Sequence, residues 1–514
     1  MKLSFETLKD KINGCWQGKN IGGILGAPFE AKRQINNVTF YTQDLTKGIP
    51  MNDDLDLQLV WLNAVEKYGR NVNASILGDY WLSYIVPDWS EYGIGKGNLR
   101  EGIQPPLSGH MANNYKDSCG CFIRSEIWAC LCAGHPEIAA RYAYEDGIVD
   151  HASEGVYAEI FCATLQAAAF VESDKWKLIE IGLSYLPDEC KVRLAVETVI
   201  DCYKSGKTWL EAREILFKIV PGYFALNGRP LKYITEEYNA EEMGMDAPNN
   251  IGIMVLGWLY GEDDFGKSLC IAVNCGEDTD CTAATLGAIL GIIHGEKALP
   301  EKWVSPIGGV IEIGCLHKHS CLLWLPKDVY ELSDRVMRNI PMFLGPDVCD
   351  IMCPDSVFEV ETAKQFNYEG DLTYIPNSSG SGLPRLLSIK ELLKLSPYCV
   401  YHNFSTFYAI LDYIDEPYIK IGEPRKMRLI IGDNKSTPQT NWLNITIYTP
   451  DGTSIVQGKH FSLPLRNVYK SQTVLEFDVL AETINSAKTE IMIDIAQAGR
   501  HTYGAVKATL FASC

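Results

Sequence analysis

Two clusters of acidic residues, more than two hundred positions apart, carry the strongest chemical signal in this sequence. The first is Asn52-Asp53-Asp54-Leu55-Asp56 and the second is Gly276-Glu277-Asp278-Thr279-Asp280-Cys281. One Asp or Ser is enough to cap a helix, and three acids packed this closely repel one another unless a cation neutralises them. Carboxylate oxygens are the ligands that Mg²⁺ and Ca²⁺ prefer. If the clusters meet in space they can hold divalent cations. Helix capping is the alternative interpretation of either cluster alone.

Each acidic cluster directly precedes a stretch with the pattern of a helix. Residues 55–68 repeat apolar side chains at helical spacing, and residues 282–294 are rich in small side chains that allow helices to approach closely. Before the first cluster, residues 22–30 (Gly-Gly-Ile-Leu-Gly-Ala-Pro-Phe-Glu) predict a glycine-rich turn that ends in Glu30.

A third candidate cluster alternates cysteine and histidine in Cys315-Leu-His-Lys-His-Ser-Cys321. In a strand the four side chains would share one face but would span about 20 Å. One tetrahedral zinc ion cannot bind all four without a sharp bend, so we interpret this segment as a loop or strand.

The elements that must position these residues fall into two parts. Residues 1–345 show helical periodicity, for example over 5–13, 154–171 and 329–342, and predict an all-α, orthogonally packed domain. Residues 346–514 predict an all-β domain, a sandwich, with the boundary between 345 and 370. Its predicted strands are 418–421, 428–431, 444–448, 474–479, 490–495 and 505–511.

Composition narrows the class of protein. The chain has 46 Lys and Arg against 65 Asp and Glu, a net charge of −19, which disfavours nucleic-acid binding. Its 17 cysteines are scattered through apolar stretches, as expected of buried, reduced thiols. The longest near-apolar run, residues 283–293, is too short to cross a bilayer, and the first residues lack the apolar region of a signal peptide. We therefore expect a cytoplasmic protein without a membrane partner. The sequence leaves its oligomeric state open.

Together these motifs resemble the ADP-ribosylglycohydrolases of the dinitrogenase-reductase-activating glycohydrolase type, over about residues 5–345. That family combines a glycine-rich segment ending in Glu, a Thr-Asp-Asp, a central Gly-Asn-Gly, a later His and a Gly-Asp-Thr-Asp-Thr before a helix of small residues. The matching segments here are 22–30, 52–54, 118–124, 150–151 and 276–281, followed by residues 300–303 (Pro-Glu-Lys-Trp).

The resemblance implies an all-α fold with two Mg²⁺ ions at the base of a cleft, where Mn²⁺ or Ca²⁺ is the alternative. By position, the implied metal ligands are Asn52, Asp53, Asp54, Asp278 and Asp280. Glu30 is the implied catalytic acid or base. The implied substrate-binding residues are Ser118, Cys119, Gly120 and His151.

This sequence departs from the family pattern at both ends of the implied site. Cys281 replaces a Thr or Ser of the family, and a thiol is a poor ligand for Mg²⁺. The next residue, Thr282, has a hydroxyl group, but that group should point about 100° further around the helix. The central loop lacks the first Gly and the Asn and adds Asp117, whose charge would disfavour a diphosphate. We therefore hypothesise that the substrate is a smaller or uncharged glycoside. Arg124 is interpreted as a structural partner of Glu126 or Asp117. Glu277 is either an extra ligand or a solvent-facing side chain.

The leading prediction is a metal-dependent glycohydrolase that cleaves a ribosyl, ADP-ribosyl or related glycosidic bond. Such cleavage passes through an oxocarbenium-like state, helped by a carboxylate and by metal-held sugar hydroxyls and water. One alternative is a non-catalytic protein that binds a sugar or ADP-ribose. Another is an O-glycoside hydrolase for a non-nucleotide sugar, with the β domain as a carbohydrate-binding or structural module. The aromatic residues between 398 and 418 are predicted to be β-core rather than sugar-stacking groups.

Overall fold

The computed structural model describes residues 2–222, 244–316, 323–345, 349–350, 359–361, 387–433, 440–466 and 471–513. These residues form two compact units. The described residues of the first unit are 2–99 and those between 108 and 361; those of the second are 100–107 and those from 387 onward. Segment 100–107 therefore belongs to the C-terminal unit, although the sequence pattern places it within the helical domain.

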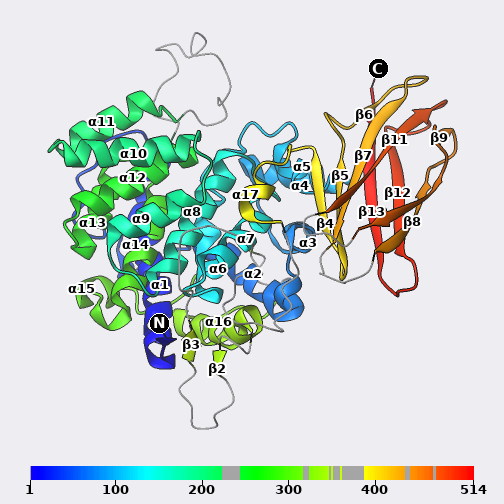
Figure 1. The fold of residues 1–514 in the computed structure, drawn as a ribbon. Coiled ribbons are helices and arrows are strands. Elements are labelled where there is room, and N and C mark those ends of the chain that lie inside the picture. The colour runs from blue at the N-terminus through cyan, green and yellow to red at the C-terminus, as the bar shows by residue number, and fades with distance from the viewer. Residues whose placement is uncertain are drawn as a thin grey trace. The chain divides into compact units, whose positions relative to one another are not determined.

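The first unit is largely helical (Figure 1). Its described helices begin and end as follows: α1 (Phe5–Gly26), η1 (Ala27–Phe29), η2 (Leu45–Lys47), α2 (Asp53–Tyr68), η3 (Gly69–Asn71), α3 (Ala74–Tyr84), α4 (Ser90–Arg100), α5 (Leu107–His110), η4 (Phe122–Arg124), α6 (Ser125–Leu131), α7 (Pro136–Gly147), α8 (Glu154–Ala169), α9 (Lys175–Ser184), α10 (Lys191–Lys204), α11 (Trp209–Ile219), α12 (Ala247–Tyr260), α13 (Phe265–Asn274), α14 (Thr279–His294), η7 (Glu296–Ala298), α15 (Glu301–Val304) and α16 (Val329–Leu344). Within the described chain, no helix is both long and apolar enough to cross a bilayer.

Three short strands make this unit less than purely helical. They are β1 (Lys2–Leu3), β2 (Cys349–Asp350) and β3 (Glu359–Glu361), and they form an antiparallel sheet in the order β1-β3-β2. Strands of two or three residues leave no periodic signal in a sequence, so β1 was missed within the predicted all-α domain. Strands β2 and β3 lie beyond residue 345 and were not among the predicted strands.

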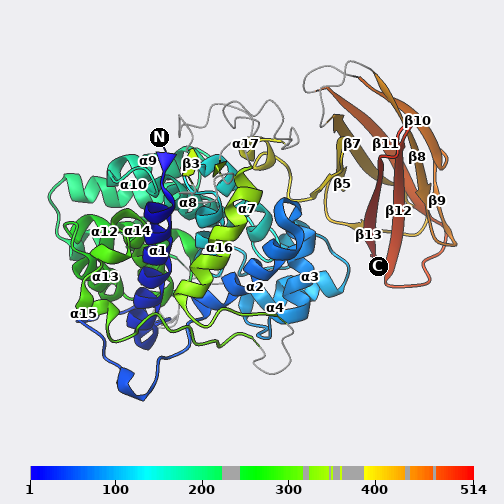
Figure 2. The ribbon, with the colours of Figure 1, turned by 90° about the horizontal axis from the view of Figure 1, so that it is seen from below.

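The closest helix pair in the first unit is α1 and α14, which lie side by side in Figure 2. A Cβ atom added at Gly18 would lie 2.0 Å from the carbonyl oxygen of Gly287, and one added at Gly22 would lie 2.0 Å from that of Ala283. Only glycine allows backbones to approach so closely. Residues 22–26 belong to the C-terminal end of α1. The prediction of a glycine-rich turn over these residues is therefore wrong. The small residues of α14 do permit close packing, as predicted.

A central helix completes the core around this pair. Helix α8 is apolar and buried on nearly every side, and it packs against α6, α7, α9 and α14. The sequence predicted it over 154–171, within two residues of its observed end. Helix α16, predicted over 329–342, runs two residues further and buries one face against α1, α2 and α6.

The described residues of the second unit form one short helix and two five-stranded sheets, drawn from yellow to red in Figure 1. One sheet has the order β10-β8-β12-β13-β6 and the other β4-β5-β7-β11-β9; all pairs are antiparallel except β13 with β6. The elements are α17 (Ile389–Leu392), β4 (Cys399–Asn403), β5 (Phe407–Asp412), β6 (Tyr418–Ile419), β7 (Arg425–Asp433), β8 (Asn441–Tyr448), β9 (Thr453–Ile455), β10 (His460–Leu465), β11 (Gln472–Ala481), β12 (Lys488–Gln497) and β13 (Tyr503–Ala512).

Alternating burial explains why the long strands of this unit were predictable. In β8, Leu443, Ile445 and Ile447 are buried while Trp442 and Tyr448 are exposed, and β11, β12 and β13 alternate in the same way over most of their length. The prediction missed β4, β5, β9 and β10. Strand β5 is buried at every position, so it has no period of two to detect.

Candidate active site

The structure brings five predicted acidic residues together from three segments of the first unit. Glu30 follows η1, Asp53 and Asp54 open α2, and Asp278 and Asp280 open α14. The thiol of Cys281 donates a hydrogen bond to Oδ1 of Asp54 over 3.4 Å and so joins the start of α14 to the start of α2. One ligand atom from each of Asp278, Asp280 and Cys281 lies within 4.8 Å of the others.

Burial and like charge disturb the protonation of these carboxyls. Burial, followed by the charges of Asp278 and Asp53, raises the pKa of Glu30 to about 8. The Glu30 residue as a whole is nevertheless exposed, so part of its side chain is in contact with solvent. Burial is also the main cause that raises the pKa of Asp53, Asp54 and Asp280, and the neighbouring carboxylates add to it. Five carboxyls held this closely cannot all ionise without a compensating cation.

Several buried oxygens of this group lack a hydrogen-bond donor. Among the described residues, neither Oδ1 nor Oδ2 of Asp278 receives a hydrogen bond of normal geometry, although the Cys119 thiol and the Asp280 carboxyl face it. Oδ2 of Asp54 is likewise buried without a donor. An unsatisfied buried carboxylate is costly in a folded protein, and a bound cation is the usual remedy. The donor set therefore fits a divalent metal.

A buried lysine next to these acids was not predicted. Lys19, on α1, is fully buried and forms an ion pair with Glu126 over 3.1 Å. Burial opposes its charge, but the carboxylates of Glu126 and Asp54 outweigh burial and raise the pKa of Lys19. Side-chain amides of Gln58 and Gln166 each donate to Glu126 over 2.9 Å and complete its surroundings. Lys19 thus supplies a fixed positive charge beside Asp54.

Two predicted acidic-cluster members have structural contacts instead. Asn52 is buried against α1, where its Nδ2 donates to Oδ1 of Asn20 over 3.5 Å and its amide lies over Gly23. Asp56 points away from the other acids, because its Oδ2 accepts from the backbone N–H groups of Gly314 and Cys315 over 2.5 and 2.7 Å.

Glu277 binds the segment that follows Glu30. It forms two hydrogen bonds with Arg33, over 2.5 and 2.9 Å, and its N–H donates to the carbonyl of Lys32 over 2.9 Å. Glu277 is buried and adopts φ +69. It is therefore neither solvent-facing nor free to act as an additional ligand, and it fixes the segment after Glu30 beside α14.

The four predicted substrate-binding residues are all buried in a hydrogen-bonded network. Ser118 Oγ and His151 Nε2 are 3.1 Å apart, and His151 Nδ1 lies 3.1 Å from Oδ1 of Asp150. The carbonyl of Gly120 accepts from Arg124, and the thiol of Cys119 faces Asp278. His151 lies just before α8 and does not cap its first turn.

Arg124 is structural, as predicted, but its predicted partners are wrong. Its guanidinium binds both oxygens of Asp150, over 2.8 and 3.0 Å, and pairs with Asp146 over 3.0 Å. Glu126 is already paired with Lys19, and Asp117 instead accepts from the N–H of Glu154 at the start of α8 over 3.1 Å. The correct partners are distant in sequence and could not be read from local spacing.

Glu91 is an acidic residue next to His151 and Gly120 that was not predicted from the sequence. Its Oε1 lies 3.8 Å from His151 Nε2, and a Cβ added at Gly120 would lie 2.3 Å from that oxygen. Burial raises the pKa of Glu91 to about 7, against the opposing effects of His151 and Ser118. Its Oε2 is buried without a hydrogen bond. No sequence motif marks this residue.

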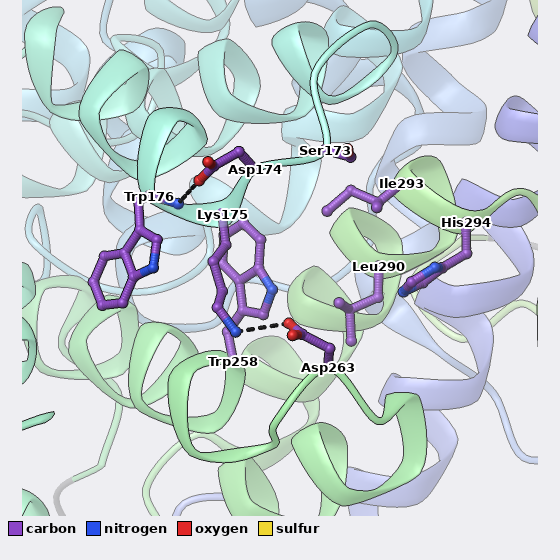
Figure 3. A pocket seen from close by; sticks show the side chains of 9 residues that line it. All are labelled: Ser173, Asp174, Lys175, Trp176, Trp258, Asp263, Leu290, Ile293 and His294. Carbon is purple, nitrogen blue, oxygen red and sulfur yellow. Dashed lines mark hydrogen bonds and ion pairs between the residues drawn. The ribbon is translucent and has the colours of Figure 1, made fainter.

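A pocket of about 440 Å³ lies elsewhere in the first unit (Figure 3). Lys175 and Asp263 form an ion pair across it, and Trp258, Leu290 and His294 line it. Leu290 and His294 belong to the end of α14 opposite to Asp280, about 15–20 Å away at the rise of a helix. The pocket shares no lining residue with the acidic site, so it does not bear on the chemistry described above.

The buried, reduced cysteines and the aromatic β-core were also predicted from the sequence. All cysteines whose side chains the structure describes are buried and free. The cysteine- and histidine-containing cluster after Leu316 lies outside the described residues. Of the aromatic residues proposed as β-core, Phe407, Tyr408 and Tyr413 are buried, whereas Tyr418 is exposed.

The family model described as ADP-ribosylglycohydrolase matches residues 4–339. No curated protein matches the chain. A solved structure titled "ADP-ribosylglycohydrolase-related protein complex" aligns with 17% sequence identity and a TM-score of 0.37, covering 66% of this chain and 100% of that chain.

Proposed function

Because this chain belongs to the ADP-ribosylglycohydrolase family, we propose that it is a divalent-metal-dependent hydrolase of a glycosidic bond. The observation that carries the metal dependence is Asp278, whose two oxygens are buried without donors among four further carboxyl groups. Family membership supports the class of reaction.

The residues that would hold the metal are Asp53, Asp54, Asp278 and Asp280. A bound divalent cation would supply Lewis-acid polarisation and would orient sugar hydroxyls and water. The role of Asn52 is then indirect, since its amide is engaged with α1.

Glu30 is suited to general acid–base catalysis. It is the exposed member of the acidic group, so substrate and water can reach it. Burial of its carboxyl, followed by the charges of Asp278 and Asp53, favours its protonated form near neutral pH. A protonated Glu30 can donate its proton to the leaving group as the bond to the anomeric carbon breaks. Water then attacks that carbon and releases a proton to solvent.

The central loop favours a substrate without a diphosphate at this position. The N–H of Ser118 donates to the carbonyl of Tyr115 and the N–H of Cys119 to that of Met245, both over 2.9 Å. These groups are therefore not available to bind phosphate oxygens. The charge of Asp117, proposed above as the obstacle, is partly offset because its carboxylate accepts from the N-terminus of α8. We propose a ribosyl or other glycosyl conjugate that is smaller than ADP-ribose.

The test is hydrolysis by the full-length protein with and without Mg²⁺, Mn²⁺ or Co²⁺. ADP-ribosyl-arginine and ADP-ribosyl-serine represent the diphosphate substrates, and ribosides and nitrophenyl glycosides represent the smaller ones. Asp53→Ala and Asp278→Ala should abolish turnover. Asp44→Ala is the matched control, because Asp44 is an exposed acid whose partners are Thr46 and Lys47.

The outcomes separate the alternatives. Metal-dependent turnover of a simple glycoside, lost in both site variants, supports the proposal, and strong activity on ADP-ribosyl conjugates would remove the substrate preference. Binding of a sugar or ADP-ribose without any turnover would support the alternative of a non-catalytic binding protein. Two features favour that alternative: Cys281 in place of a Thr or Ser, and a central loop whose Ser118 and Cys119 N–H groups are already hydrogen-bonded.

We further propose that the two sheets of the C-terminal unit pack as a β-sandwich. Each sheet buries one side of its long strands, and Thr406 before β5 donates to Gln497 of β12 in the other sheet over 2.6 Å.

A further inference from the structure

Cys281 lies among the carboxylates proposed to bind metal. It is buried, and its sulfur lies within 4.8 Å of carboxylate oxygens of Asp278 and Asp280 as well as 3.4 Å from Asp54 Oδ1. Metal–sulfur bonds of about 2.3 Å and metal–oxygen bonds of about 2.0–2.2 Å allow two ligand atoms on one ion to lie up to about 4.5 Å apart. Only a small movement is needed for these side chains to bind the same ion.

The hydroxyl groups of the first turn of α14 do not occupy this place. Thr279 Oγ1 donates to the carbonyl of Gly26 over 2.8 Å, and Thr282 Oγ1 donates to the carbonyl of Thr279 over 3.2 Å. Both hydroxyls are therefore engaged with backbone. The sulfur of Cys281 is the group that this turn adds to the carboxylates of Asp278 and Asp280.

A separate observation indicates that a cation belongs beside this sulfur. Both oxygens of Asp278 are fully buried and lack a donor among the described residues, and their charge acts on Cys281. In the metal-free protein, burial and the charges of Asp278, Asp54 and Asp280 raise the pKa of Cys281, so the sulfur keeps its proton until a cation displaces it.

We propose that Cys281 Sγ is a metal ligand, and that the site selects a thiophilic divalent cation such as Zn²⁺, Fe²⁺ or Co²⁺ over Mg²⁺. This inference rests on the proposed metal-dependent function. Mg²⁺ takes oxygen ligands and binds sulfur poorly, whereas the thiophilic ions accept a mixed set of carboxylate and thiolate. Binding breaks the S–H bond and forms a metal–sulfur bond, and the proton leaves to solvent.

The experiment is a titration of the metal-free, full-length protein with Co²⁺, followed by absorbance. A thiolate ligand produces a sulfur-to-cobalt charge-transfer band in the near ultraviolet, separate from the visible bands that oxygen ligands also give. Calorimetry compares the affinities for Co²⁺ and Mg²⁺. The variant is Cys281→Ser. The control is Cys202→Ser, because Cys202 is also buried but its charged neighbours are Lys207, Asp201 and Glu211.

The expected result is a charge-transfer band in the wild type and in Cys202→Ser that is absent in Cys281→Ser. The wild type should prefer Co²⁺ to Mg²⁺ by about 100-fold, and Cys281→Ser should reduce that preference by about tenfold or more. Cobalt binding without the band would overturn the thiolate ligand while leaving the proposed function intact. Failure to bind either ion would overturn both.

X-ray absorption of the wild type loaded with one equivalent of Zn²⁺ tests the same claim without the Cys281 variant. A sulfur neighbour at about 2.3 Å is expected in the wild type and in Cys202→Ser, and a shell of oxygen and nitrogen alone would refute the proposal.

Discussion

We expect the close contact between α1 and α14 to position the acidic site, and Gly18→Ala tests this directly. The new Cβ would lie 2.0 Å from the carbonyl oxygen and 2.6 Å from the carbonyl carbon of Gly287. Carbon–oxygen contacts normally begin at about 3.3 Å, so the two backbones must separate locally by roughly 1.3 Å. No change of rotamer can relieve a clash with backbone.

The expected loss follows from two opposing effects. Overpacking of a tight core contact costs about 1–3 kcal/mol, and a clash with backbone belongs at the upper end. Replacing a helical glycine by alanine gains about 0.5–1 kcal/mol in helix propensity. The net expectation is a loss of about 2 kcal/mol in the free energy of unfolding, and a lower affinity for metal because Glu30 and Asp280 move apart.

The assay is urea unfolding with and without metal, and Gly97→Ala is the control. Gly97 also lies within a helix, α4, but a Cβ there has no atom within 4 Å. The control should therefore be about 0.5–1 kcal/mol more stable than the wild type. If Gly18→Ala is as stable as Gly97→Ala and binds metal equally well, the close contact does not position the site. Gly287→Ala meets the same contact from the other side, at 2.1 Å from Gly18 O, so the double variant should lose less than the sum of the two losses.

Three further perturbations follow from the buried charges. Asp278→Asn removes a buried charge from its like-charged neighbours, so the metal-free protein should melt at a higher temperature than the wild type while losing its stabilisation by metal; unchanged stabilisation would contradict our assignment. The pKa of Glu30 is raised to about 8, so the folded metal-free protein binds more protons than the unfolded chain. Its stability should therefore fall as pH rises from about 4 to 8, and saturating metal should flatten that slope in pH-dependent urea unfolding. Arg124→Gln leaves Asp146 and Asp150 buried without their cation and should lower the unfolding free energy by about 3–5 kcal/mol in the same assay. A change below 1 kcal/mol would show that these carboxyls are neutral in the folded protein.

The sequence could predict the long elements because their side chains alternate between core and solvent or repeat along one face. Helices α2, α8, α14 and α16 and the long strands were found within a few residues of their ends. Strand β5 was missed because it is buried throughout, and β1 to β3 were missed because pairing between residues 2–3 and 360–361 depends on the whole chain.

The acidic site was predictable in its ligand types but not in its surroundings. Lys19 resembles an ordinary surface lysine, yet it lies between Gly18 and Gly22, which face α14, so its burial could have been inferred from that spacing. Glu126 lies in an apolar segment that includes Trp128, which is a similar clue. Glu91 offered no such clue, because only the folded chain brings it to Gly120 and His151.

These surroundings link metal binding to folding. Lys19 is shared between Asp54 and Glu126, so within the described site its single charge cannot neutralise the five carboxyls from Glu30 to Asp280. The metal-free chain can fold only by keeping several of these carboxyls protonated, which the raised pKa values of Asp54 and Asp280 express. A cation present at 100 times its dissociation constant would stabilise the folded state by about 2.7 kcal/mol. The tight α1–α14 contact holds the acidic side chains together whether or not a cation is present. The free energy of cation binding therefore offsets the electrostatic repulsion that these carboxylates exert on one another in the folded protein.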